Sequence, residues 1–129
     1  MGKIQKFEDI ESWKKARILA NEIYRITSRA PFVRDFGLKD QIRRAVVSIL
    51  SNIAEGFERG GDKEFLQFLA IAKGSCGEVR AQSYVALDQG YVSQLEFEQL
   101  TNIAKEVSQL LSGLMKYLKQ SDLRGSKFR

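Results

Sequence analysis

The chain contains no histidine and a single cysteine, Cys76, among its 129 residues. One thiol cannot form a disulfide within the chain, and zinc sites of the usual kind are excluded because imidazole ligands are absent. The lack of histidine also excludes serine–histidine and cysteine–histidine nucleophile pairs, and the Glu-x-x-His pairs that hold di-metal centres in helical bundles. We therefore expect no metal, no cofactor and no enzymatic activity, with Cys76 as a thiol of the core.

Residues that break helices and patterns that build sheets are scarce as well. The single proline, Pro31, lies in RAPFVRDFG, and no alternating apolar–polar run or Asn-Gly or Asp-Gly hairpin is found. Apolar residues instead recur at spacings of three and four. At this length, with 43% hydrophobic and 29% charged residues, the composition is typical of one globular domain.

Long apolar runs are also missing. None approaches the roughly 20 residues that a membrane-spanning helix needs. The N-terminal stretch MGKIQKFEDIESWKK lacks the apolar region of a signal peptide. We therefore expect a cytoplasmic protein with no membrane partner.

The apolar periodicity predicts four helices with mostly short connections. We expect them from Ile10 to Ser28, from Leu38 to Glu58, from Lys63 to Asp88, and from the Ser93 cap to Gln120. Asp9 and Asp62 are the predicted N-caps of the first and third helices, and Gly90 is expected just past the end of the third. Ser93 and Glu96 have capping-box spacing. The prediction is an all-α, up-down-up-down antiparallel four-helix bundle over residues 1–129, with a polar, frayed tail at 121–129.

Polar residues form a row on one face of the second predicted helix and a matching row on the third. The first row is Arg44, Ser48, Asn52 and Glu55, and the second is Ser75, Glu78 and Gln82. If the helices are antiparallel around Gly60 and Gly61, Arg44 lies level with Glu78, and Ser48 with Ser75.

Two interpretations fit these rows. One is a carboxylate site that uses Glu55 and Glu78, but at ~1.5 Å per residue the two lie roughly 15 Å or more apart along the helices. We favour the other, a satisfied polar seam that fixes the register of the two helices. The predicted seam consists of Arg44, Ser48, Asn52, Glu55, Ser75 and Glu78, and within it Arg44 and Glu78 form an ion pair mostly shielded from water.

Small residues follow another face of the third helix. They are Ala70, Gly74, Gly77 and Ala81. Each glycine inside a helix costs roughly 1 kcal/mol relative to alanine. The stripe therefore indicates a close approach, either by another helix of the same chain or by a second subunit.

The formal net charge is +5, which favours anionic partners. Four basic residues, predicted to be exposed and to cluster near the second turn, are the candidate nucleic-acid contacts: Arg43, Arg59, Lys63 and Lys73. A solvated helical face is the alternative interpretation of each one. Because most aromatic residues fall on apolar faces, we expect contacts to the nucleic-acid backbone rather than reading of bases.

Four segments occur in an order that is also found in a known family. They are FEDIESWKKARILANEIYRIT, GLKDQIRRAVVSILSNIAEGFERG, KEFLQFLAIAKGSCGEVRAQ and LDQGYVS. From Phe7 to Leu118 the chain resembles the bacterial four-helix-bundle proteins encoded by intervening sequences in 23S (large-subunit) ribosomal RNA genes. Its Asn52, Glu55, Gly56, Ser75 and Glu78 stand at that family's motif positions. Many members have proline where this chain has Leu50, so a straighter second helix is expected here.

The resemblance implies closed bundles that assemble as ring-shaped homopentamers. Such bundles are structurally similar to the accessory variability determinant of diversity-generating retroelements, a basic pentamer that binds a reverse transcriptase and nucleic acid. The leading hypothesis is a non-enzymatic, nucleic-acid-associated assembly protein that binds RNA or DNA. The alternative is a protein-binding adaptor, for example for a reverse transcriptase, without direct nucleic-acid recognition.

Overall fold

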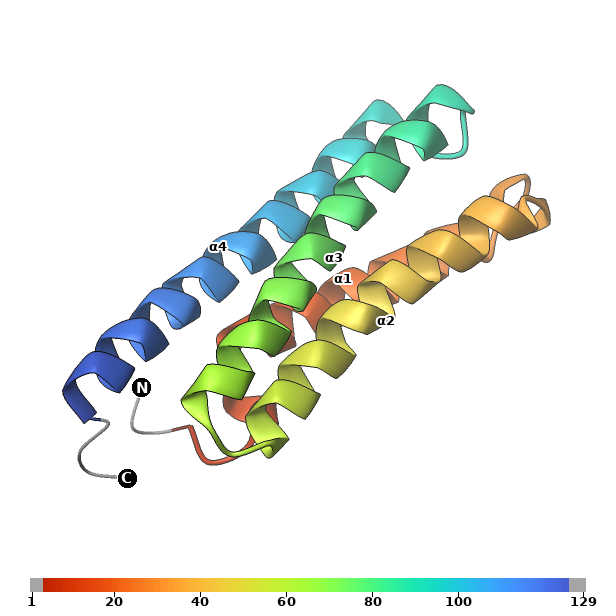
Figure 1. Ribbon diagram of the computed structural model, residues 1–129. Helices are drawn as coiled ribbons and strands as arrows, with labels where there is room; N and C mark the ends of the chain where they lie inside the picture. The colour runs from red at the N-terminus through yellow and green to blue at the C-terminus, as the bar shows by residue number, and fades with distance from the viewer. Residues whose placement is uncertain (1–3, 126–129) are drawn as a thin grey trace.

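The computed structural model describes residues 4–125 as four long helices and two short 3-10 turns (Figure 1). The helices are α1 (Glu11–Thr27), α2 (Phe36–Glu58), α3 (Asp62–Asp88) and α4 (Gln94–Gly125), and the turns are η1 (Phe7–Asp9) and η2 (Phe32–Arg34). No strand occurs in the described part of the chain. The predicted all-α class is confirmed.

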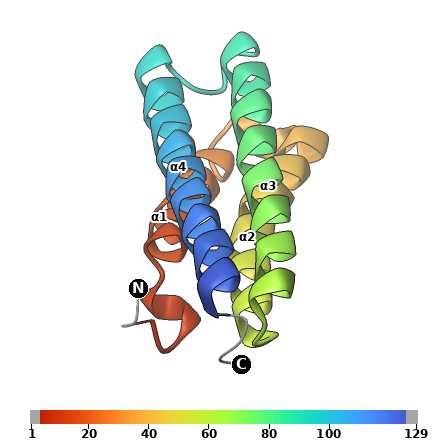
Figure 2. The ribbon, with the colours of Figure 1, turned by 60° about the vertical axis from the view of Figure 1, so that its left-hand side comes forward.

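The helices form an antiparallel bundle in which each one packs against two neighbours: α1 against α2 and α4, and α3 against α2 and α4. Figures 1 and 2 show the α2–α3 connection at one end and the α1–α2 and α3–α4 connections at the other. This is the predicted up-down-up-down order. None of the described helices is both long and apolar enough to cross a membrane.

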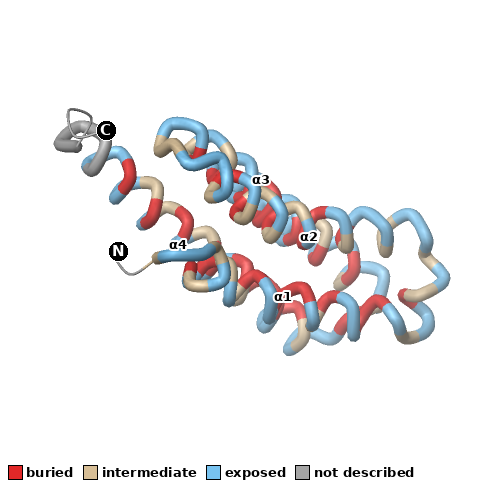
Figure 3. Tube along the Cα trace, turned by 90° about the horizontal axis from the view of Figure 1, so that it is seen from below, coloured by how far each residue is buried: buried red, intermediate tan, exposed pale blue. Residues whose placement is uncertain are grey.

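The apolar stripes predicted from the sequence face the interior of the bundle (Figure 3). Ile42, Val46, Ile49 and Ile53 from α2 are completely or almost completely buried, as are Leu69, Ala72, Cys76 and Val79 from α3. α2 is one unbroken helix through Leu50, in agreement with the absence of proline there. α4 continues to Gly125, past the predicted end at Gln120, and residues 126–129 of the predicted tail lie outside the described residues.

Two of the predicted N-caps are wrong. Asp9 belongs to η1, where its carboxylate accepts hydrogen bonds from the backbone N–H groups of Gln5 and Lys6, so it serves the turn before α1 rather than α1 itself. Asp62 already lies in the first turn of α3, and Gly61 is the N-cap. α2 begins two residues before the predicted Leu38 because Asp35 caps it, accepting from the backbone N–H of Leu38 at 3.1 Å.

Both signals around the α3–α4 connection are confirmed. Ser93 Oγ accepts from the Glu96 backbone N–H at 3.1 Å, and Glu96 Oε1 accepts from the Ser93 N–H at 2.9 Å, which completes the capping box. Gly90 has φ +76°, and α3 ends in a Schellman motif in which Tyr91 N–H donates to the carbonyl of Ala86 at 2.9 Å.

Candidate functional site

Three of the predicted seam residues join α2 to α3. Ser75 Oγ donates to Ser48 Oγ across the helix pair at 3.0 Å, and Asn52 Nδ2 donates to the same hydroxyl at 2.9 Å. Ser75 is buried, whereas Ser48 and Asn52 are half-buried. Because a slip of one helix along the other would separate the two hydroxyls, this group of Ser48, Asn52 and Ser75 fixes the register.

The predicted ion pair between Arg44 and Glu78 is wrong. Both side chains are exposed, and no ion pair joins them within the described residues. Glu55 is exposed too and holds Arg59 of its own helix at 2.8 Å. The levels along the helices were predicted correctly, but the rotation of each helix places these charges on its outer edge, where they keep their hydration. Neither a carboxylate site nor a charged seam is formed.

Gly56, the last motif residue of α2, lies at a close approach of α2 to α3. A Cβ atom added there would lie 2.6 Å from the Cβ of Phe68 and 3.0 Å from Cδ1 of Phe65. Gly56 is buried between the helices. Two of the three residues of the Asn–Glu–Gly motif, Asn52 and Gly56, therefore serve the packing of α2 against α3, whereas Glu55 does not.

The small-residue stripe of α3 lies open to solvent. A Cβ atom at Gly74 or Gly77 would meet nothing within 4 Å, and Ala70 and Ala81 are exposed. Exposed apolar side chains lie near it on α3: Ile71 (52%) and Val85 (45%). Close packing by another described helix of the same chain, one of the two alternatives, is therefore wrong. Packing by a second subunit stays a prediction.

The four predicted nucleic-acid contacts do not form one cluster. Arg43 and Arg59 lie near opposite ends of α2, roughly 24 Å apart along its axis. Arg43 is also half-buried instead of exposed. Its Nε donates to Thr27 Oγ1 at 2.8 Å, and its guanidinium lies 4.4 Å from the centre of the Tyr24 ring. Arg43 lies too far from the turn between α2 and α3 to join Lys63 there.

The other three candidates differ in how far their charge is compensated. Arg59 binds Glu55 at 2.8 Å and Glu64 at 3.7 Å, and the hydrogen bond and charge of Glu55 raise the pKa of Arg59. Lys63 and Lys73 are exposed, and neither forms an ion pair within the described residues. Of these three residues, the two lysines are the ones whose charge is free for a ligand.

A polar network at the end that carries the α1–α2 and α3–α4 connections was missed. The guanidinium of Arg29 donates to both carboxylate oxygens of Glu96 at 2.6 Å. The pKa of Glu96 is lowered to about 2, first by this pairing and then by the hydrogen bond from the Ser93 backbone. Nearby, Tyr91 donates its hydroxyl proton to Asp35 at 2.9 Å, which raises the Tyr91 pKa. The capping box was the only sequence signal that pointed here.

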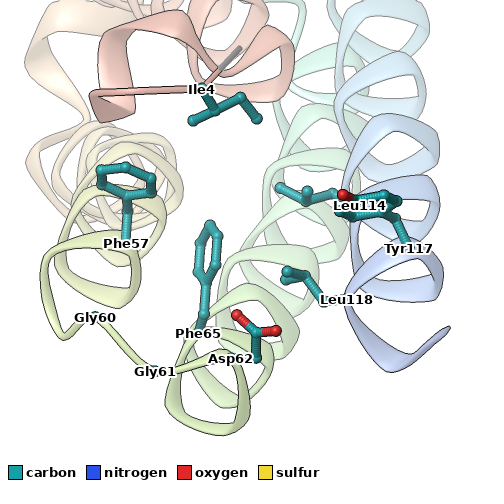
Figure 4. A pocket seen from close by; sticks show the side chains of 9 residues that line it. All are labelled: Ile4, Phe57, Gly60, Gly61, Asp62, Phe65, Leu114, Tyr117 and Leu118. Carbon is teal, nitrogen blue, oxygen red and sulfur yellow. The ribbon is translucent and has the colours of Figure 1, made fainter. Parts of the chain in front are cut away.

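An apolar cavity of about 270 Å³ opens at the other end of the bundle (Figure 4). Its lining residues are Ile4, Phe57, Gly60, Gly61, Asp62, Phe65, Leu114, Tyr117 and Leu118. Figure 4 shows the two phenylalanine rings opposite the α4 side chains, with Ile4 above them. A second cavity of about 460 Å³ shares Ile4, Leu114 and Tyr117, so the two are adjacent. Such a lining suits an apolar group rather than a phosphate.

Cys76 is fully buried, and burial raises the pKa of its thiol to about 12. The prediction of a core thiol is confirmed. The described residues hold no group of three or more acidic or cysteine side chains arranged for a metal ion.

Comparison with known proteins places the chain in a family. No curated protein matches it. Among solved structures it is similar to a protein of unknown function from the S23 ribosomal protein family of Bacteroides thetaiotaomicron, with a TM-score of 0.75 and 23% identity over 81% of this chain and 95% of that one. This likeness shows a shared fold. The family model of the 23S rRNA-intervening sequence proteins matches residues 8–113, and the chain belongs to this family.

Proposed function

We propose that the protein is a non-enzymatic, nucleic-acid-associated assembly protein that works as a basic, ring-shaped homopentamer in the cytoplasm. The observation that carries the proposal is positive charge on exposed helix faces that no carboxylate compensates. Lys63, Lys73 and Arg44 are exposed and form no ion pair within the described residues. The phosphate backbone of RNA or DNA is the complementary surface for such charges.

Self-association would multiply this weak attraction. Five copies at +5 bring a formal charge of 5 × 5 = +25 around one axis. Repeated weak contacts then act together, because the second contact of a bound polymer is made at high effective concentration. The open stripe of Ala70, Gly74, Gly77 and Ala81 supports assembly, since it lets a helix of another subunit approach the α3 backbone closely.

Nucleic-acid binding is tested by filter-binding titrations of RNA and DNA at low and moderate salt. We expect affinity to fall steeply with salt, because neutralised phosphates release counterions. The variant Lys63→Glu/Lys73→Glu should bind more weakly than Lys14→Glu/Lys15→Glu, which makes the same charge change at two lysines that are paired with Glu11 and Glu106. Equal weakening by the two variants would mean that Lys63 and Lys73 do not contact the nucleic acid. No binding by the parent protein at low salt would contradict the proposal of nucleic-acid binding.

Assembly is tested separately by light scattering. The parent protein should have the mass of a pentamer at micromolar concentration. Gly77→Leu should dissociate it, because the leucine side chain fills the space that the stripe leaves open, whereas Lys105→Leu on α4 should not. A stable monomer of the parent protein would contradict this part of the proposal.

The second candidate function is a protein-binding adaptor, such as an accessory protein of a reverse transcriptase, without direct nucleic-acid recognition. The observation that favours it is the apolar cavity between α4 and the α2–α3 turn, where Tyr117 is 38% exposed. Partner binding that is insensitive to salt and is lost in Tyr117→Glu would support the adaptor over the nucleic-acid protein.

A further inference from the structure

We propose that Arg43, Arg44 and Ser48 form a phosphate-binding site in the hollow between α1 and α2, and that a phosphodiester of bound nucleic acid docks there. This proposal rests on the nucleic-acid binding proposed above and names residues that would contact the phosphate. The hollow has a volume of about 590 Å³ and is open to solvent. Its lining residues are Tyr24, Asp40, Arg43, Arg44, Val47, Ser48 and Ser51.

Arg43 is held in place before any ligand binds. Its Nε donates to Thr27 Oγ1 at 2.8 Å, its Nη2 donates to Ser28 Oγ at 3.1 Å, and its guanidinium lies over the Tyr24 ring. These contacts come from neutral groups of α1, so they orient the cation without neutralising it. The Nη1 donors form no hydrogen bond within the described residues and remain for a ligand. A planar guanidinium fixed in this way loses little entropy on binding a phosphate.

Arg44 and Ser48 lie one helical turn apart on α2 and add further donors. Arg44 is exposed and forms no ion pair within the described part of the chain. The Ser48 hydroxyl accepts two hydrogen bonds, from Ser75 and from Asn52. Since a hydroxyl has two lone pairs and one proton, Ser48 has its own proton left to donate. Ser48, which lines the hollow, can therefore donate its hydroxyl proton to a ligand there.

The charge balance of the hollow favours an anion. Asp40 is the one carboxylate in its lining, and it forms an ion pair with neither arginine within the described residues. Three arginines elsewhere in the bundle are already held by glutamates: Arg25 by Glu22, Arg29 by Glu96 and Arg59 by Glu55. Arg17, Arg34 and Arg80 form no ion pair within the described residues, but none of them lines this hollow. Two uncompensated guanidiniums beside a hydroxyl donor match the oxygens of a phosphate. The open shape lets a polymer backbone pass across the site.

The test compares Arg44→Gln with Arg59→Gln by fluorescence anisotropy of a labelled single-stranded RNA over a series of salt concentrations. Both variants remove one exposed arginine charge from α2 or its C-cap, but Arg59 is compensated by two glutamates. In Arg44→Gln we expect weaker binding and a slope of log K against log salt that is smaller by about 0.7 for each subunit whose site the strand occupies, the value for one phosphate contact of a single strand. Arg59→Gln should keep the parent slope.

The amide signals of isotope-labelled protein in NMR spectra provide a second measurement. Those of Arg44, Ser48 and Ser51 should shift on addition of the RNA and, at higher concentration, of inorganic phosphate. Equal effects of the two arginine variants would overturn the site and leave the proposed function standing. Shifts with inorganic phosphate but no RNA binding would overturn the assignment to a phosphodiester. A parent protein with neither salt-dependent RNA binding nor shifts on addition of inorganic phosphate would overturn both the site and the function.

Discussion

Gly56 offers the sharpest test of how α2 and α3 pack. An alanine there would place its Cβ atom 2.6 Å from the Cβ of Phe68, whereas carbon atoms in contact prefer about 3.5–4.0 Å. The helices must therefore separate by roughly 1 Å, and such overpacking costs about 1–3 kcal/mol. The gain in helix propensity returns about 1 kcal/mol. We expect Gly56→Ala to lower the free energy of unfolding by up to about 2 kcal/mol.

The assay is urea denaturation followed by far-UV circular dichroism, with Gly113→Ala in α4 as the matched control. A Cβ atom at Gly113 would meet nothing within 4 Å, so the same substitution should stabilise the bundle by up to about 1 kcal/mol. Phe68→Ala should not rescue Gly56→Ala, because alanine retains the Cβ atom that is struck. If Gly56→Ala gains as much stability as Gly113→Ala, the close approach is refuted.

Three further predictions concern other parts of the bundle. The Glu96 pKa is lowered from 4.5 to about 2, so its ion pair stabilises the fold fully above about pH 4.5 and the stabilisation is lost as the pH falls toward 2. That shift corresponds to about 3 kcal/mol, reduced to about 2 because Arg29 is 41% exposed, and Glu96→Gln should remove this pH dependence from denaturation curves. Ser75→Ala should lower the free energy of unfolding by about 1 kcal/mol, because the hydrogen bond to Ser48 is lost. Glu78→Ala, at an exposed position, should change the free energy of unfolding by less than about 0.5 kcal/mol. A larger effect of Glu78→Ala would indicate that Glu78 does form an ion pair with Arg44. Cys76 should react with iodoacetamide only after unfolding, and rapid reaction of the folded protein would contradict its burial.

The sequence predicted those features that depend on local spacing. The interior stripes follow from the periodicity of three and four, and the end of α3 at Gly90 and the start of α4 at Ser93 follow from residue types at fixed offsets. The pairing of Ser48 with Ser75 could also be predicted, because a short turn between antiparallel helices sets which residues lie level.

Features that depend on helix rotation and on distant pairing could not be predicted. The numbering placed Arg44 level with Glu78, but only the packed core decides that both point away from the α2–α3 contact. Arg29 and Glu96 are 67 residues apart, and they meet because two connections of different length end at the same place. The pairing of Arg59 with Glu55, in contrast, has i, i+4 spacing and could have been predicted from the sequence.

Ser48 connects the hydrogen bonds between α2 and α3 to the hollow on the surface of the bundle. Its hydroxyl accepts from Ser75 and Asn52 at the α2–α3 contact, and Ser48 also lines the hollow together with Arg44. Removing the buried Ser75 hydroxyl would free one lone pair and let the Ser48 proton turn inward or rotate, so a substitution that never touches solvent would alter hydrogen-bond donation outside. Conversely, an anion that accepts the Ser48 proton would make its oxygen a stronger acceptor for both inner donors. The packing of α2 against α3 and the binding of an anion at the surface would then both depend on the hydrogen bonds of the Ser48 hydroxyl.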